Sequence, residues 1–134
     1  MTAGTGPLEA LGLRASAISE WITGSYRTGI DPEVVLWRRV TKVCEESGEV
    51  WKALAGMVGE NPRKGVTNDV TEVIEELLDT ALAALGAVEQ LTGDEGHSGR
   101  LLVEKSERVL ARAIPHGAVD PFAEGSQPSP GPGA

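Results

Sequence analysis

The chain has 134 residues, a formal net charge of −8 and only 4% aromatic residues. This length predicts a single domain, and the negative charge disfavours a nucleic-acid polymer as partner, because its phosphates would be repelled. The one cysteine, Cys44, excludes an internal disulfide and a cysteine-rich zinc site. No apolar run is long enough for a membrane span, and the first residues lack the pattern of a signal peptide. We therefore expect a cytoplasmic protein with no membrane association.

Helical patterns occupy most of the chain between two Gly- and Pro-rich ends. We expect a flexible N-terminus over residues 1–7, a helical domain over residues 8–114 and a disordered tail over residues 115–134. Asp31-Pro32-Glu33 is a strong helix start, with an N-cap, a proline and an acid in the first turn. Asn68 is expected to cap the third helix. No strand-like alternation is present, so the sequence predicts an all-α protein with helices at residues 8–26, 31–55, 69–91 and 100–113.

Two acidic pairs lie thirty residues apart on the second and third predicted helices. Glu46 and Glu49 form the first pair, and Glu76 and Asp79 form the second. Residues three apart share one face of a helix, so each pair can direct two carboxylates toward one point. Four carboxylates together would offer the hard oxygen ligands that Mg²⁺ or Mn²⁺ prefers. Acids at this spacing are also common on solvated helix faces, which is the alternative interpretation.

A helical wheel places the two pairs in the same phase relative to an apolar stripe. The stripes are centred on Ser47 and Leu77, and each acidic pair lies beside its stripe. If the helices pack antiparallel with stripe against stripe, both acidic edges meet on one flank of the hairpin. We expect the following residues to be buried: Val40, Val43, Cys44, Val50, Trp51, Leu54, Val70, Val73, Ile74, Ala81, Ala84 and Val88. Trp51 could instead stack on a base, although the core or a subunit interface is favoured.

The segments K-V-C-E-E-S-G-E and E-E-L-L-D resemble the two motifs of the MazG-like all-α nucleoside triphosphate pyrophosphohydrolases. That superfamily includes dimeric dUTPases, dCTP pyrophosphatases and phosphoribosyl-ATP pyrophosphatases. The resemblance covers about residues 31–91. It implies a helical hairpin with flanking helices, in a four-helix-bundle-like fold completed by oligomerisation. It also implies Mg²⁺-dependent hydrolysis of a nucleoside triphosphate to the monophosphate and pyrophosphate, with a house-cleaning role. The small residues Thr80-Ala81 and Ala83-Ala84 depart from the bulkier family pattern and leave the nucleotide undefined.

The resemblance also implies roles for individual residues. By position, the metal ligands would be Glu46, Glu49, Glu76 and Asp79. Glu45 would be a further ligand, an outer group, or the base that deprotonates water. Arg63 and Lys64 would contact phosphates, or else form a solvated basic dipeptide in a loop. Lys42 is a further phosphate candidate, although pairing with Glu46 one turn later is favoured.

Two other functions stay open. A hairpin with short flanking helices exposes much apolar surface, so we expect a homodimer or homotetramer. The same surface suits a non-catalytic helical protein that serves oligomerisation or regulatory binding. Within the enzyme class, the substrate could be another pyrophosphate, such as phosphoribosyl-ATP.

Overall fold

The computed structural model describes residues 4–26 and 28–125. Residues 1–3 of the predicted flexible N-terminus and residues 126–134 of the predicted tail lie outside this part. Across the described residues the chain is helical and has no strand, which confirms the all-α class. No helix in this part combines the length and apolar character needed to cross a membrane. The elements are α1 (Pro7–Gly24), α2 (Pro32–Val58), α3 (Val70–Thr92), α4 (Ser98–Ala113) and the 3₁₀ turn η1 (Ile114–His116).

The chain divides into two units, Met1–Arg100 and Leu101–Ala134. The first holds α1, α2, α3 and the first residues of α4, and the second holds the rest of α4, η1 and the turns after it. In the second unit, Gly117 ends η1 with a left-handed φ of 106°. The side chain of Asp120 then accepts the N–H of Phe122 at 2.9 Å. The domain predicted over residues 8–114 therefore spans both units, and residues 117–125 form turns and bends.

The starts of α2 and α3 follow from local capping. α2 starts as predicted, because the Asp31 side chain accepts the N–H of Glu33 at 2.8 Å. The predicted cap of α3 is wrong by one residue, since Asp69 and not Asn68 is the N-cap. The Asp69 carboxylate accepts the N–H of Glu72, and the Glu72 carboxylate accepts the N–H of Asp69 at 2.7 Å. This reciprocal capping box requires an acid three residues beyond the cap, which Asn68 lacks.

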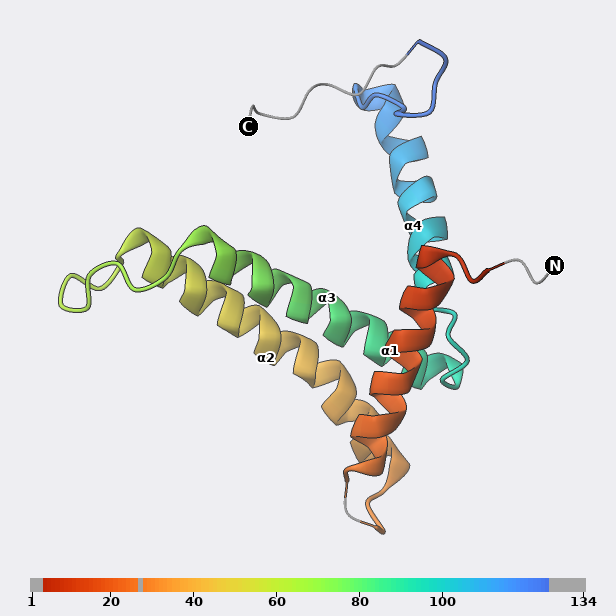
Figure 1. Cartoon of the computed structure of the whole chain (residues 1–134), viewed down its shortest axis with the longest axis horizontal. Coiled ribbons are helices and arrows are strands. Elements are labelled where there is room, and N and C mark those ends of the chain that lie inside the picture. Colours follow the sequence, from red (N-terminus) through yellow and green to blue (C-terminus); the bar gives the residue numbers. More distant parts are fainter. Residues whose placement is uncertain (1–3, 27, 126–134) are drawn as a thin grey trace. The chain divides into compact units, whose positions relative to one another are not determined.

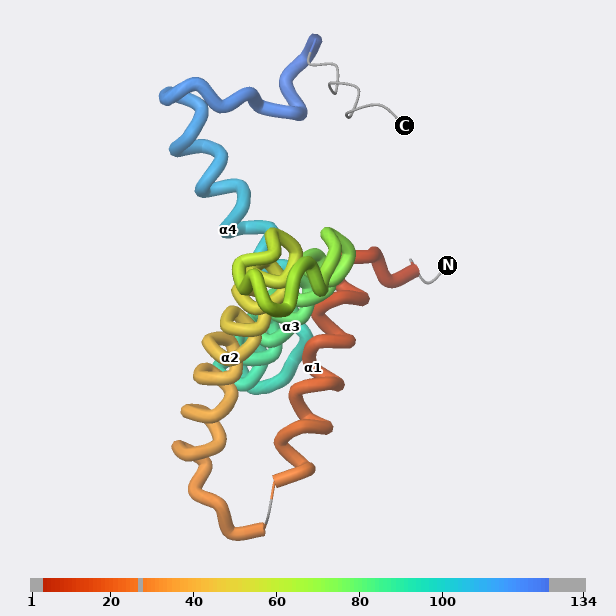
Figure 2. The backbone as a smooth tube through the Cα atoms, turned by 90° about the vertical axis from the view of Figure 1, so that its left-hand side faces the viewer, coloured from red at the N-terminus to blue at the C-terminus, as the bar shows by residue number. Residues whose placement is uncertain are grey.

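Helices α2 and α3 run antiparallel as a long hairpin, and α1 crosses it (Figures 1 and 2). Ser16 Oγ on α1 donates to the carbonyl of Asp94 at 2.6 Å, just after α3. Thr23 Oγ1 donates to Gln90 Oε1 on α3 at 3.0 Å. The buried apolar residues are few and mostly small, namely Ala15, Val35, Ala53, Leu85 and Ala87. The first unit is therefore held by close approach of small side chains and by polar links more than by a large apolar core.

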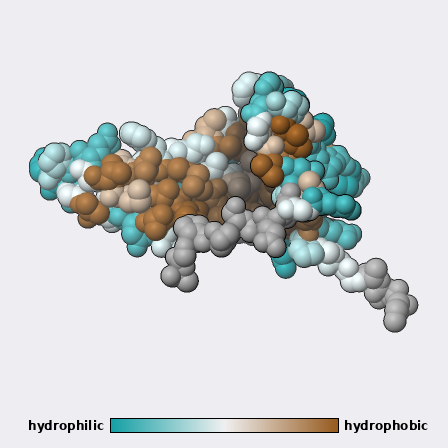
Figure 3. Space-filling model, turned by 90° about the horizontal axis from the view of Figure 1, so that it is seen from above, coloured by the Kyte–Doolittle hydropathy of each residue, from teal (hydrophilic) through white to brown (hydrophobic). Residues whose placement is uncertain are grey.

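The inner face of the hairpin differs from the prediction. Of the residues expected to be buried, Val43, Val50, Val73, Ala84 and Val88 are half-buried. The others are exposed, namely Val40, Cys44, Trp51, Leu54, Val70, Ile74 and Ala81. Buried small residues, including Ala53 and Gly86, line the inner face instead. A helical wheel weighs apolar character alone, whereas two backbones approach closely only where side chains are small. Figure 3 shows the resulting apolar side chains along the outside of the hairpin.

A buried carboxylate organises the turn between α3 and α4. Glu89 is fully buried, and its two oxygens accept the backbone N–H groups of Gly96 at 2.9 Å and Ser98 at 2.7 Å. These bonds cap the first turn of α4, which starts two residues before the predicted position. On α1, Gly12 passes so close that a Cβ there would collide with the carbonyl oxygen of Gly96. The turn, α1 and α3 thus meet at one tightly packed point.

Candidate metal centre

Three predicted ligands come together between α2 and α3. Glu46, Glu76 and Asp79 each offer a carboxylate oxygen, and these oxygens all lie within 4.8 Å of one another. Glu46 and Glu76 are half-buried on the inner face of the hairpin, and Asp79 is exposed one turn further along α3. The predicted convergence is therefore present for three of the four acids.

The surroundings of Glu76 shift the pKa of its carboxyl group. Desolvation raises the pKa of Glu76 above its ordinary value, and the negative charges of Asp79, Glu49 and Glu46 raise it further. Lys52 opposes this with a smaller, lowering effect. A carboxylate whose ionised form is disfavoured by its like-charged neighbours would be relieved by a cation. Three hard oxygens at this spacing fit Mg²⁺, which commonly takes a few carboxylates and fills its other positions with water and phosphate oxygens.

The fourth predicted ligand, Glu49, forms an ion pair with Lys52. Its Oε1 accepts from Lys52 Nζ at 2.8 Å, and Glu49 lies outside the group of three converging carboxylates. Its hydrogen bond and charge raise the pKa of the Lys52 ammonium. Glu49 nevertheless acts on the pKa of Glu76, so its charge is felt at the cluster.

The predicted pairing of Lys42 with Glu46 is confirmed. Lys42 Nζ lies 2.7 Å from Glu46 Oε1 and 3.1 Å from Glu45 Oε1. Its hydrogen bonds with Glu46 and then Glu45 raise the pKa of the ammonium group. Glu45 is itself well exposed. Lys42 therefore brings a positive charge directly beside the carboxylate cluster.

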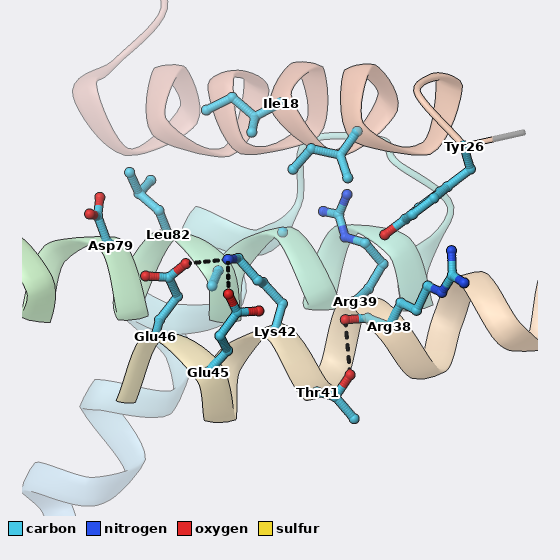
Figure 4. Close-up of a pocket in the computed structure, with 13 residues that line it drawn as sticks. Ile18, Tyr26, Arg38, Arg39, Thr41, Lys42, Glu45, Glu46, Asp79 and Leu82 are labelled. Carbon is cyan, nitrogen blue, oxygen red and sulfur yellow. Dashed lines mark hydrogen bonds and ion pairs between the residues drawn. The ribbon is translucent and has the colours of Figure 1, made fainter. Parts of the chain in front are cut away.

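A cavity of about 700 Å³ adjoins the cluster. It lies among α1, α2 and α3, and Glu46 and Asp79 stand at one end of it in Figure 4. Its lining consists of Ile18, Ile22, Tyr26, Arg38, Arg39, Thr41, Lys42, Glu45, Glu46, Asp79, Leu82, Ala83 and Gly86. The volume is within the usual range for small-molecule sites, and mixed apolar walls with a few charged groups are typical of them.

The end of the cavity away from the carboxylates is aromatic and basic (Figure 4). Tyr26 follows the end of α1, and the Arg38 guanidinium lies over its ring at 5.4 Å from the centroid. Arg39 is only 5% exposed, and its Nη1 donates to the carbonyl of Ser19 on α1 at 3.1 Å. The cavity thus joins an anionic end, apolar walls and a cationic end.

Two predicted phosphate contacts lie elsewhere. Arg63 and Lys64 belong to the loop at the tip of the α2–α3 hairpin, whereas the acids lie within the helices (Figure 1). Lys64 lines a separate, smaller cavity with Trp51 and Asn61. Within one chain, neither residue is among those that line the cavity beside the carboxylates.

The sequence did contain a signal for the basic end of the cavity. Arg39, Lys42 and Glu46 are spaced by three and four residues, so they share one face of α2. Following that face from Glu46 back along α2 reaches Arg39. The burial of Arg39, and the position of Tyr26 in the cavity wall, depend on how α1 crosses the hairpin. Helical periodicity does not encode this crossing.

No protein-family model, no curated protein and no solved structure matches this chain.

Proposed function

We propose that this protein is a metal-dependent nucleoside triphosphate pyrophosphohydrolase. The proposal is supported above all by the convergence of Glu46, Glu76 and Asp79, of which Glu46 and Asp79 line the cavity. A triphosphate needs charge neutralisation and positioning above all, and a carboxylate cluster suited to Mg²⁺ beside a nucleoside-sized cavity offers both. The likeness of residues 31–91 to the MazG-like motifs supports the same activity.

The residues divide into distinct roles. Glu46, Glu76 and Asp79 would hold Mg²⁺, and Glu49 would join them once its carboxylate left Lys52. When bound, the metal would neutralise the triphosphate and polarise the attacked phosphorus.

Glu45 would take the proton from the attacking water as the anhydride bond breaks and pyrophosphate leaves. Lys42, close to both Glu45 and Glu46, would contact a phosphate oxygen. Arg63 and Lys64 stand outside this cavity, so within one chain the phosphate contact falls to Lys42.

A pyrophosphate-release assay tests the proposal. Canonical and modified nucleoside triphosphates, together with phosphoribosyl-ATP, are incubated with the protein and either Mg²⁺, Mn²⁺ or a chelator. The proposal predicts release of pyrophosphate from at least one nucleoside triphosphate, abolished by chelation. Release that survives chelation would contradict the metal dependence, and exclusive turnover of phosphoribosyl-ATP would favour that substrate.

A non-catalytic role is the second candidate, favoured by a separate observation. Trp51, Ile74 and Leu77 are all exposed on the hairpin, and an apolar surface of this kind commonly marks an interaction site. If no member of the panel is hydrolysed, this surface would be the functional part of the molecule. The two functions are compatible if a second copy covers the surface, in a homodimer or homotetramer that keeps the cavity open.

A further inference from the structure

The guanidinium of Arg39 is the least expected group in the cavity. Arg39 is 5% exposed, and no carboxylate in the described part of the chain lies within ion-pair distance of it. Burying a charge without an acidic partner is costly. Among the described residues its hydrogen bond runs from Nη1 to the carbonyl of Ser19 at 3.1 Å. A guanidinium has five N–H donors, so donors beyond this one remain to be satisfied.

The structure also makes room for this group on α3. A Cβ on Gly86 would lie 2.7 Å from Arg39 Nη2, which is closer than real Cβ contacts. Glycine therefore allows the guanidinium to sit between α2 and α3 while Arg39 lines the cavity. In Figure 4 it stands beside Tyr26, at the end opposite Glu46 and Asp79.

The two ends of the cavity suit the two ends of one ligand. If the carboxylates hold the metal and the phosphates, the nucleobase occupies the end with Tyr26 and Arg39. Tyr26 lines the cavity there with Arg39 and offers an aromatic surface to a flat ring. The edge of that ring would face a group that only donates hydrogen bonds.

We propose that Arg39 selects purine nucleotides whose base presents a 6-oxo group to it, as in hypoxanthine and guanine. The reason is donor and acceptor matching. A guanidinium pairs in a forked geometry with a carbonyl oxygen and a neighbouring ring nitrogen. Adenine carries an amino group at the corresponding position, which would place donor against donor. This inference rests on the proposed function for the placement of the phosphates, and it deepens that function by naming a substrate class.

The matched substrates dITP and dATP test the selection by turnover, because they differ in the 6-oxo and 6-amino groups. One good forked pair discriminates by about 1–3 kcal/mol, or roughly 5- to 150-fold. We therefore expect kcat/KM to be about fivefold or more higher for dITP than for dATP. Equal values, or a preference for dATP, would overturn the inference while leaving the pyrophosphohydrolase activity standing.

Binding of the monophosphates IMP and AMP, measured by calorimetry in the presence of Mg²⁺, tests the same selection independently of turnover. Tighter binding of IMP supports the inference even if no triphosphate is hydrolysed, in which case the proposed function alone fails. Equal affinities, tighter binding of AMP, or no binding of IMP at millimolar concentration would overturn it.

Variants assign the selection to Arg39. Arg39→Lys keeps a positive charge but loses the fork, and Gly86→Ala leaves Arg39 in place while pushing on its guanidinium. Both should bring the dITP to dATP ratio of kcat/KM toward unity. Arg14→Met, an exposed arginine on α1 outside the cavity, should leave the ratio unchanged. If the two variants lower kcat/KM by the same factor for both substrates, Arg39 serves phosphate binding or folding, and the selection is refuted.

Discussion

Two single residues, Glu76 and Glu89, have pKa values shifted in opposite directions. In the carboxylate cluster, desolvation and the charges of Asp79, Glu49 and Glu46 raise the pKa of Glu76. Glu89 shows the opposite balance. Burial alone raises the pKa of its carboxyl, but hydrogen bonds from Ser98 and Gly96 outweigh this and lower it overall. Like-charged neighbours thus disfavour the ionised form of Glu76, whereas backbone N–H groups favour that of Glu89.

Glu76→Gln should therefore affect the metal-free and the metal-bound protein in opposite directions. Removing one of several like charges should raise the Tm of the metal-free protein, and removing a ligand should abolish the rise in Tm that Mg²⁺ gives the wild type. Thermal unfolding with chelator and with Mg²⁺ measures both effects. Glu75→Gln, an exposed neighbour on the same helix, should change neither. A Glu76→Gln protein that keeps the Mg²⁺-dependent rise would remove Glu76 from the site.

Glu89→Gln should destabilise the fold in a pH-dependent way. The folded-state pKa of Glu89 lies below its ordinary value of 4.5, so its stabilising contribution is fully present above pH 4.5 and is lost as the pH falls through the folded-state pKa. We expect the variant to lose about 1–3 kcal/mol of unfolding free energy at pH 7, since its charge-assisted bonds to buried N–H groups are weakened. Below pH 4.5 the difference from the wild type should shrink.

Urea unfolding of both proteins from pH 7 to pH 3 measures the effect of Glu89→Gln. Glu20→Gln, at an exposed position on α1, is the matched control and should follow the wild type at every pH. A difference between Glu89→Gln and the wild type that stays constant over this range would show that the negative charge of Glu89 contributes nothing.

At the scale of helices, local signals were predictable and packing was not. The start of α2 at Asp31 depends only on neighbouring residues, and so does the capping box at Asp69, although we expected the cap at Asn68. The convergence of Glu46 with Glu76 was predictable because their phases match. Which face of each helix turns inward depends on where small residues allow backbone contact, and a count of apolar positions does not report that.

Alanine substitutions at two glycines distinguish the effect of packing on stability from the effect of helix propensity. Gly12→Ala would place a Cβ against the carbonyl oxygen of Gly96, a backbone atom that cannot rotate away. We expect it to cost about 1–3 kcal/mol of unfolding free energy, as overpacking does. Gly48→Ala in the middle of α2 meets no atom within 4 Å and should stabilise by about 0.5–1 kcal/mol through helix propensity. Urea unfolding measures the change in unfolding free energy for both variants. Equal changes would contradict the close approach of α1 to the turn between α3 and α4.

At the scale of the whole molecule, the exposed apolar face of the hairpin is the largest unexplained feature of the first unit. Trp51 is 60% exposed and Leu77 is 52% exposed, although both belong to the stripes predicted to be buried. Within the described part of the first unit, both side chains stay exposed. We propose that a second copy covers them.

Leu77→Glu should then convert the protein to a monomer, because a buried charge without a partner is disfavoured at an apolar interface. Light scattering after size-exclusion chromatography gives the mass. The control is Phe122→Glu, which changes an apolar residue that is 90% exposed in the other unit and should leave the assembly intact. A wild-type protein that is monomeric at all concentrations would contradict the proposal.

We propose that carboxylates from α2 and α3 form one metal site that supports pyrophosphate release. The most direct measurement compares pyrophosphate release at saturating Mg²⁺ by the wild type, by Glu76→Gln combined with Asp79→Asn, and by Glu75→Gln. We predict turnover by the wild type and by Glu75→Gln, and loss of turnover in the double variant, whose fold is verified by its helical circular dichroism. Turnover by the folded double variant at the wild-type rate would contradict the claim.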